Sequence, residues 1–519
     1  MDPAFSVESV RVAEGSAMAR LPSDELMHRA AFALATRCAQ LLTLQRGSLV
    51  GSRVVVLTGS GNNGGDALWA ASHLAQRGVA VTAILLDRRW HRESAEALLR
   101  HGGRLEPVDL DIHQPLIDTA DLVLDGILGI GGAGALRSPA AELAARAGAS
   151  AAVVVAVDLP SGVDADTGAV ADPSAAIWAQ ETVTFGCLKP GLLVSPGAGL
   201  VGDLTLIDIG LDLADAGQPV VRRIGEADAA ALVPFPGEND DKYTRGVVGV
   251  VAGSPPYPGA GILCSGAARL GGAGMVRYAG SAPDYVINRW PEVVVAAGGP
   301  ATAGRVEAWV VGPGAGTDEA AHQRLTQALE SEVLVVVDAD GLTLLAGDES
   351  LRDLLQARRA AGRVTVITPH AGEFARLGFV LPEGESADRI GAVKNAAAQL
   401  GAVVLLKGHE TVVAEPGGLA FVNTLSDSAL ATAGSGDVLS GLLGSLLAAE
   451  TARSGVLTEQ AAAQAAACAA LIHGLAGCLA AGSGRPVTSE DVLSAVSQAI
   501  ATLRNSDPTL ESDRAGDEG

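Results

Sequence analysis

The chain has few aromatic residues, 3 % of 519, and few charged ones, 18 %. A charged fraction this low, together with 48 % apolar residues, excludes general disorder and predicts sizeable buried cores. At roughly 150 residues per domain, the length predicts several domains. Basic residues are in the minority, since 36 Lys and Arg face 59 Asp and Glu and leave a formal charge of −23. So acidic a surface repels phosphate backbones and argues against a nucleic-acid-binding protein.

Cysteine is also scarce, and the five cysteines form no C-x-x-C pair. Their odd number and scattered spacing argue against a disulfide framework or a structural zinc site and favour the reducing cytoplasm. Residues 1–5 lack the basic start and the apolar core of a signal peptide. Residues 461–482 resemble a membrane span in length, but they are mostly alanine and predict a buried helix instead. We therefore expect a cytoplasmic homo-oligomer that has neither a membrane nor a nucleic acid as a partner.

Short β-branched runs alternate with alanine-rich stretches along most of the chain, which is typical of βαβ units and parallel sheets. The predicted strands comprise residues 54–57, 79–86, 121–124, 153–157, 247–251, 308–311, 333–337, 364–367 and 403–406. The polar segment 212–219 contains glycine and proline and predicts a linker. The fold class is thus α/β, with one domain at 1–212 and a second at 222–504. The acidic tail 505–519 predicts disorder.

A glycine turn follows the first predicted buried strand, at residues 59–66. Gly59, Gly61 and Gly64 match the pattern G-x-G-x-x-G, and Asp87 follows about twenty residues later, as in dinucleotide-binding folds. Glycines there let the backbone approach a pyrophosphate at a helix N-terminus. The pattern alone is weak, because an ordinary turn between a strand and a predicted helix at 67–77 explains it too.

Polar side chains also follow the next strands, with Asp125 after one and Asp158 and Ser161 after another. Ligands of open α/β sheets bind outside the carboxyl ends of the strands, so these residues should share a crevice with Asn63 and Asp66. Oxygen donors without histidine or cysteine suit a hard cation. The alternative is that Asp125 and Asp158 only cap the helices that follow them.

The segments 26–30, 62–66, 125–129 and 158–164 resemble, in this order, motifs of the NAD(P)H-hydrate epimerase family, and the resemblance covers most of residues 5–210. It implies a Rossmann-like three-layer αβα domain that binds K⁺ through Asn63, Asp125 and Ser161, with Asp158 contacting the substrate as the acid/base. The residues that it implies for holding the hydrate, besides Asp158, are Asn62, Asn63, Gly64, Gly65, Asp66, Gly129, Ile130, Gly131, Gly132, Ala133, Gly134 and Ala135.

The second half lacks the pattern G-x-x-x-x-G-K-[ST], which excludes a P-loop NTPase. Instead, residues 433–437 open an apolar helical stretch at 438–447. Backbone N–H groups of such a turn bind anions, and Asp437 beside them could accept a proton from a hydroxyl. Helix capping explains Asp437 equally well from this stretch alone. His370 and Lys407 follow other predicted strands, where either could serve a ligand or simply be solvated.

The segments 242–246, 253–254, 312–316, 338–340, 368–373, 407–408 and 434–437 together resemble the ADP-dependent NAD(P)H-hydrate dehydratase family, roughly over residues 222–500. The resemblance implies a ribokinase-like αβα domain with ADP as co-substrate and Mg²⁺ as the metal. The residues that it implies for the hydrate are Ala260, Gly316, His370 and Asp437. Those implied for the nucleotide are Lys407, Gly408, His409, Glu410, Thr411 and Gly436.

The two resemblances together imply a bifunctional enzyme that repairs hydrated NADH and NADPH. One site would interconvert the R and S hydrates, and the other would dehydrate the S form with ADP, giving AMP and phosphate. Two alternatives stay open at this stage. One is a ribokinase-like small-molecule kinase fused to a Rossmann-like nucleotide-binding domain, and the other is a nucleotide sensor without catalysis.

Overall fold

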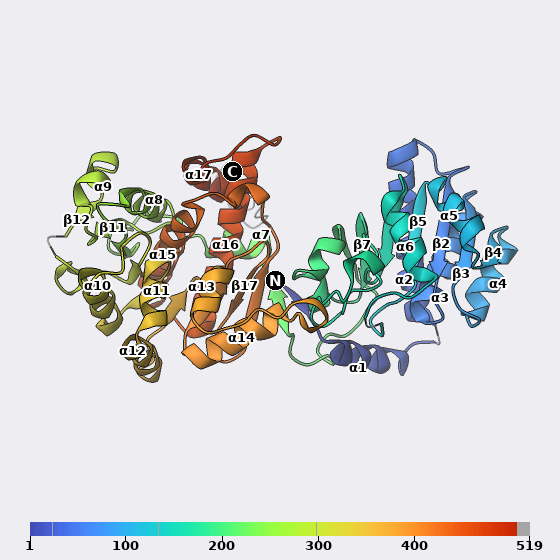
Figure 1. Ribbon diagram of the computed structural model, residues 1–519, viewed down its shortest axis with the longest axis horizontal. Coiled ribbons are helices and arrows are strands. Elements are labelled where there is room, and N and C mark those ends of the chain that lie inside the picture. The colour runs from blue at the N-terminus through green and yellow to red at the C-terminus, as the bar shows by residue number, and fades with distance from the viewer. Residues whose placement is uncertain (23, 133, 297, 506–519) are drawn as a thin grey trace, which may run out of the picture. The chain divides into compact units, whose positions relative to one another are not determined.

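The structure is a computed structural model that describes residues 1–22, 24–132, 134–296 and 298–505. The chain divides into two compact units (Figure 1). The N-terminal unit comprises Asp2–Val221 and Pro382–Asp388, and the C-terminal unit comprises Met1, Arg222–Leu381 and the chain from Arg389 onward. The expected linker 212–219 therefore belongs to the N-terminal unit. Of the tail 505–519, only Asn505 lies within the described residues, and it ends helix α17.

The N-terminal unit contains a seven-stranded parallel sheet in the order β4-β3-β2-β5-β6-β7-β8. Its strands are β2 (Arg53–Thr58), β3 (Ala80–Leu85), β4 (Arg104–Pro107), β5 (Leu122–Gly126), β6 (Val153–Val157), β7 (Glu181–Phe185) and β8 (Asp203–Ile207), and a short β1 (Asp2–Ala4) precedes them. The strand order reverses between β2 and β5. In doubly wound sheets this is where ligands bind.

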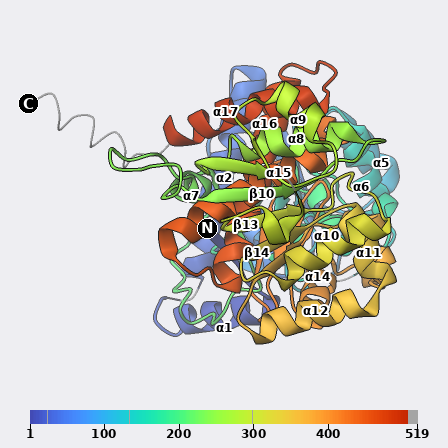
Figure 2. The same cartoon turned by 90° about the vertical axis from the view of Figure 1, so that its left-hand side faces the viewer.

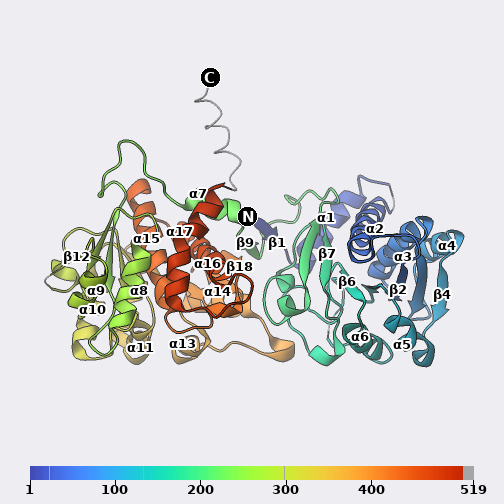
Figure 3. The same ribbon diagram turned by 90° about the horizontal axis from the view of Figure 1, so that it is seen from above.

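Helices cover both faces of this sheet, because its central strands are apolar on both sides (Figure 3). The helices of this unit are α1 (Val7–Met18), α2 (Glu25–Arg46), α3 (Asn62–Gln76), α4 (Arg92–Arg100), α5 (Leu110–Asp118) and α6 (Ala140–Ala149). Two separate apolar clusters result, one between the sheet and α2, α3 and α4, and the other between the sheet and α5 and α6.

The sheet of the C-terminal unit follows the order β9-β18-β17-β16-β15-β14-β13-β10-β11-β12, and Figure 2 shows β10, β13 and β14 in succession. Its strands are β9 (Val221–Arg223), β10 (Val247–Val251), β11 (Met275–Tyr278), β12 (Val294–Val295), β13 (Ala308–Val311), β14 (Leu334–Val337), β15 (Thr365–Ile367), β16 (Val403–Leu406), β17 (Thr411–Ala414) and β18 (Ala420–Asn423). Pairing is parallel from β12 to β16, whereas β16, β17 and β18 form an antiparallel meander. The predicted α/β class with parallel sheets is confirmed in both units.

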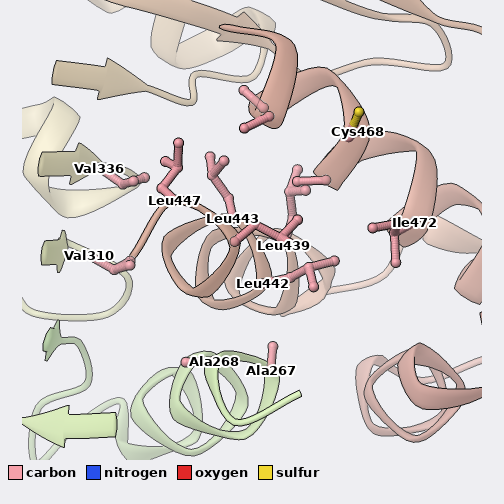
Figure 4. Packing of buried hydrophobic residues seen from close by; sticks show 14 of the residues in the cluster. Ala267, Ala268, Val310, Val336, Leu439, Leu442, Leu443, Leu447, Cys468 and Ile472 are labelled. Carbon is pink, nitrogen blue, oxygen red and sulfur yellow. The ribbon is translucent and has the colours of Figure 1, made fainter. Parts of the chain in front are cut away.

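The helices of the C-terminal unit are α7 (Glu226–Leu232), α8 (Pro258–Ala268), α9 (Pro283–Arg289), α10 (Glu319–Glu330), α11 (Asp340–Gly347), α12 (Glu349–Ala360), α13 (Ala371–Arg376), α14 (Arg389–Leu400), α15 (Ser435–Ser454), α16 (Glu459–Ala481) and α17 (Ser489–Asn505). Helix α15 lies in the middle of the core, and its leucines contact α8, α16 and the sheet (Figure 4). Glycine makes this packing possible, because a Cβ on Gly441 would lie 2.1 Å from the Cys264 carbonyl oxygen.

Two helices begin earlier than the sequence predicts. Helix α3 starts at Asn62 rather than at residue 67, and α15 starts at Ser435 rather than at 438. Gly64 therefore lies inside α3, where a Cβ on it would come within 2.2 Å of the Gly59 carbonyl oxygen. Close packing, rather than turn geometry, requires glycine there. Helix α16 is long and apolar enough to span a membrane, but 78 % of its most apolar window is buried within the unit, as predicted.

Candidate functional sites

A cavity of about 590 Å³ lies in the N-terminal unit where the strand order reverses. The start of α3, the loop after β5 and the residue after β6 line it, so the strand ends do meet as predicted. The predicted substrate residues that line the cavity are Asn62, Asn63, Asp66, Gly129, Ile130, Gly131, Gly132 and Asp158.

Other predicted residues of this site do not line the cavity. Gly64 and Gly65 are buried within α3, and Gly134 and Ala135 lie outside the cavity lining. Ala133 lies outside the described residues. Asp87, the candidate ribose ligand of a dinucleotide fold, is exposed and is not part of the lining.

Asp158 is bound to a buried lysine that the sequence analysis did not single out. The Nζ atom of Lys189 lies 2.6 Å from Oδ1 of Asp158, and Lys189 is only 1 % exposed. The same Oδ1 accepts hydrogen bonds from the Thr184 hydroxyl at 3.0 Å and from the Phe185 N–H at 3.4 Å. Asp158 has φ +67°, an uncommon conformation for a residue with a side chain that is often found at functional sites. No helix begins at Asp158, so capping does not explain it.

Three further carboxyl groups line the same cavity, those of Glu14, Asp24 and Asp66. Burial, with Asp158 and Glu14 as negative neighbours, raises the pKa of Asp66 well above its usual range. Burial and Asp158 also raise the pKa of Glu14, while Lys189 and Arg11 act against the rise. The cavity wall therefore carries one carboxylate paired with an ammonium and two carboxyl groups, Asp66 and Glu14, whose pKa values are raised.

Asn63, which lines the cavity, and Asp125 and Ser161, which do not, are brought together at the Leu128 backbone. Asp125 is fully buried and accepts hydrogen bonds from the Ser161 N–H at 2.8 Å, the Ser161 hydroxyl at 2.7 Å and the Ile127 N–H at 3.2 Å. The Leu128 N–H donates to the Ser161 hydroxyl at 2.9 Å, and the Asn63 amide donates to the Leu128 carbonyl at 2.8 Å. Burial raises the pKa of Asp125 to about 6. Among the residues that the structure describes, no basic side chain forms an ion pair with it.

A second cavity, of about 640 Å³, lies in the C-terminal unit beyond β16 and the start of α15. All but one of the predicted nucleotide residues line it, namely Lys407, Gly408, His409, Thr411 and Gly436. The exception, Glu410, is buried and does not line it. Leu425, Leu430 and Ala470 provide an apolar wall, and His473 from α16 lies beside them. Such a mixture of an apolar surface with a few polar groups is typical of small-molecule sites.

Asp437 lies in the first turn of α15, and its surroundings hold four other charged groups. Burial, followed by the negative charge of Asp338, raises the pKa of Asp437 to about 7, although Lys407 opposes the rise. Lys407 donates to Asp338 Oδ1 at 2.8 Å, and Ser440 donates to Asp338 Oδ2 at 2.7 Å. The N-cap of α15 is Gly434, so Asp437 is not the cap of this helix. Helix capping therefore does not explain Asp437.

The remaining predicted hydrate residues are Ala260 in the first turn of α8, Gly316 in the loop after β13, and His370 at the N-cap of α13. Asp340 adds to the negative potential at Asp437 and accepts a hydrogen bond from the Gly316 N–H at 2.9 Å. Ala260 packs against the same loop, since a Cβ on Gly314 would lie 2.6 Å from its methyl group. The His370 ring accepts N–H groups of Gly372 and Glu373 at its Nδ1 atom and so caps α13, while its Nε2 atom lies 3.5 Å from Oε1 of Glu373. His370 also lines the cavity. Ala260, Gly316 and Asp437 themselves do not line the 640 Å³ cavity.

In each unit, parallel strands end in carboxylates near a helix whose N-cap is glycine, and a cavity adjoins them. Such an arrangement is typical of α/β enzymes that bind phosphate-bearing small molecules. The family model described as "NAD(P)H-hydrate dehydratase" matches residues 248–498, and the one described as "YjeF-related protein N-terminus" matches residues 23–191.

Whole-chain relatives agree with these matches. The bifunctional NAD(P)H-hydrate repair enzyme Nnr of Mycobacterium tuberculosis H37Rv is 50 % identical over 460 residues, which cover 88 % of this chain and 91 % of that protein. The enzyme of the same name from Mycobacterium leprae is 47 % identical, and the match covers 96 % of this chain and 98 % of that protein.

A solved structure matches part of the chain. The crystal structure of the ADP/ATP-dependent NAD(P)H-hydrate dehydratase from Bacillus subtilis, co-crystallized with ATP/Mg²⁺, has a TM-score of 0.45 at 23 % identity, and the match covers 55 % of this chain and 99 % of that chain.

The chain belongs to the family of bifunctional NAD(P)H-hydrate repair enzymes. Both family resemblances noted in the sequence are thereby confirmed.

Proposed function

We propose that this protein returns hydrated NADH and NADPH to the usable coenzymes in two reactions. The N-terminal site, within residues 1–212, interconverts the R and S hydrates, and the C-terminal site, within residues 222–504, dehydrates the S form with ADP. One observation carries this proposal: this member of the repair family has a cavity in each unit. The N-terminal cavity lies beside a carboxylate at the end of a parallel strand, and the C-terminal cavity lies beside a carboxylate at a helix start.

In the first reaction, the hydroxyl group on C6 of the hydrated ring is part of a hemiaminal. The C6–O bond breaks as the ring nitrogen supplies its lone pair, and water returns to either face of the resulting iminium. Asp158 provides a negative charge at the cavity wall for this cation. Asn62 to Asp66 and the loop 129–135 hold the phosphates and ribose, since the start of α3 offers unpaired N–H groups to anions.

In the second reaction, Asp437 takes the proton of the hydroxyl group, whose oxygen then attacks the terminal phosphoryl group of ADP. AMP leaves, and the phosphate ester then breaks its C6–O bond as the ring nitrogen supplies its lone pair. Loss of a proton from C5 restores NAD(P)H with release of phosphate. A pKa of about 7 lets Asp437 serve as a base at neutral pH. Lys407 and the residues 408–411 and 436 hold the nucleotide, while Ala260, Gly316 and His370 hold the hydrate.

Two metal ions complete the proposal. Asn63, Asp125 and Ser161 would hold K⁺, since all three carry oxygen and the buried Asp125 carboxylate has no basic partner among the described residues. A cation there would supply the missing positive charge. In the C-terminal unit, Mg²⁺ would neutralise phosphate charge. The described residues contain no group of three or more His, Cys, Asp or Glu placed to hold a metal, which suits an ion bound largely through the nucleotide.

The deciding experiment follows the absorbance of reduced nicotinamide when the purified protein meets prepared NADH hydrate with ADP, with ATP or without a nucleotide. Recovery of absorbance with ADP, together with AMP and phosphate, supports the proposal. A phosphorylated product that accumulates with ATP would instead identify a small-molecule kinase, and no turnover would identify a sensor. We further propose a cytoplasmic location, which the five free cysteines fit, and a homo-oligomer, which light scattering tests.

A further inference from the structure

The epimerase cavity brings two aspartates, Asp66 and Asp158, into opposite electrostatic environments. Both line the same wall, yet one is paired with a buried ammonium group and the other faces two negative groups. When the surroundings of two carboxyl groups differ in this way, one can stay ionised while the other holds a proton, so the two take different roles in a reaction. The question is which of them carries the proton that the hydroxyl group must receive to leave as water.

Asp158 is poorly suited to carry that proton. Its Oδ1 atom accepts three hydrogen bonds, from Lys189, Thr184 and Phe185. Lys189 in turn uses its ammonium to bind the Thr184 hydroxyl and the Phe185 carbonyl, both at 3.0 Å, so it is fixed in place. A proton on Asp158 would leave a buried ammonium without its counter-charge, which is strongly unfavourable. Asp158 therefore presents to the cavity a carboxylate that is ion-paired with Lys189.

Asp66 has the complementary properties. Its side chain lies one turn into α3 and is half-buried, and within the described residues it forms no hydrogen bond or ion pair. Burial and the charges of Asp158 and Glu14 raise its pKa well above the usual range. The titratable and charged groups that face the cavity from the elements around it are Arg11 and Glu14 of α1, Asp24 before α2, His91 before α4, Asp158 after β6 and Lys189 after β7. Of these, Asp158 and Glu14 are the ones whose negative charges, together with burial, raise the pKa of Asp66.

We propose that Asp66 is the general acid and base of the epimerase site, while Asp158 is the counter-charge of the cationic intermediate. Protonated Asp66 gives its proton to the C6 hydroxyl, the C6–O bond breaks with release of water, and the ring nitrogen's lone pair forms the C=N bond of the iminium beside Asp158. Water then adds to C6 from the other face and returns one proton to Asp66, so atoms and charges balance over the cycle. This inference rests on the epimerase activity proposed above.

The test compares isosteric variants in epimerisation of the purified R hydrate without ADP, with the S hydrate separated by chromatography. Asp66→Asn should lower kcat about 10²- to 10⁴-fold, the usual contribution of a general acid, and change KM only a few-fold. Asp66→Glu should restore part of the loss. Asp87→Asn is the matched control, because it removes the same charge outside the cavity lining and should leave kcat within about threefold. ADP-dependent consumption of the S hydrate should be unchanged in all three variants, which shows that the chain has folded.

The pH dependence gives an independent result. Because the protonated form of Asp66 starts the reaction, wild-type kcat should fall as the pH rises through the pKa of Asp66, and Asp66→Asn should lack this fall while Asp87→Asn keeps it. The inference is overturned if Asp66→Asn keeps kcat within about threefold, or if Glu14→Gln rather than Asp66→Asn loses the activity and the pH response. A wild-type protein that does not epimerise at all would refute the proposed function instead.

Discussion

Oδ1 of Asp338, at the end of β14, lies 2.8 Å from Nζ of Lys407, at the end of β16, so the two strand ends are tied across β15. The other oxygen of Asp338 accepts the hydroxyl of Ser440 from α15 at 2.7 Å. Asp338 is 1 % exposed, and these two contacts fix its negative charge beside Asp437. The ion pair therefore controls how readily Asp437 gives up or accepts a proton.

The first prediction concerns the pH dependence of dehydration. Burial and Asp338 raise the pKa of Asp437 to about 7, and the base must be ionised, so kcat/KM for the S hydrate should rise as the pH increases through about 7. Asp338→Asn removes the nearby negative charge and frees the Lys407 ammonium, and both changes lower the pKa of Asp437. The rise should therefore move to lower pH. Ser440→Ala is the control, since it keeps the charge of Asp338 and should keep the pH profile. A profile that is the same in Asp338→Asn and wild type contradicts the prediction.

The second prediction separates the two sites. Asp437→Ala should abolish the ADP-dependent recovery of reduced nicotinamide and leave R-to-S epimerisation intact, because Asp437 belongs to the C-terminal unit. Asp158→Ala should do the reverse, so that only the S hydrate is consumed quickly. The two assays are the chromatographic separation of the epimers and the absorbance of NADH. Loss of both activities in both variants would show that the division into two sites is wrong.

Much of both sites can be predicted because an apolar run that ends in an acid can be recognised from neighbouring residues. Asp125 and Asp158 follow buried strands or end them, and parallel strands bring their carboxyl ends to one edge of the sheet. The partners of these acids cannot be predicted in this way. Lys189 lies 31 residues from Asp158, and Lys407 lies 69 residues from Asp338, so no local periodicity connects either pair. The available signal is a lysine within an apolar segment, since such a residue is buried only when it is paired.

The start of α3 lies earlier than predicted for a related reason. A run of glycines usually indicates a turn, but Gly64 is required by its contact with the Gly59 carbonyl, which only the folded chain reveals. Tertiary packing thus overrides the low helix propensity of glycine at this position.

The third prediction concerns the stability of the N-terminal unit. Lys189→Met leaves the Asp158 carboxylate buried without its partner and should lower the free energy of unfolding by about 3–5 kcal/mol, as is usual when half of a buried ion pair is removed. Adding Asp158→Asn to Lys189→Met should recover part of the loss. Arg20→Met is the matched control in the same unit, because the Arg20–Asp215 pair is largely exposed and should contribute less than about 1 kcal/mol. Urea unfolding followed by circular dichroism measures all three, and equal losses in Lys189→Met and Arg20→Met would contradict the prediction.

The fourth prediction joins K⁺ to the protonation of Asp125. Burial raises the pKa of Asp125 from 3.8 to about 6, so the folded state binds this proton more tightly than the unfolded chain does. The N-terminal unit should therefore lose stability as the pH rises from about 4 to about 6, and above that range it carries the full cost of the buried charge, about 3 kcal/mol.

A cation beside Asp125 offsets this cost only when the carboxylate is ionised. K⁺ should thus slow hydrogen exchange in peptides covering residues 122–132 at about pH 8 and have little effect at about pH 4.5, compared with tetramethylammonium at equal ionic strength. Asp125→Asn should abolish the response to K⁺ at the higher pH, and a response that survives this substitution would place the ion elsewhere.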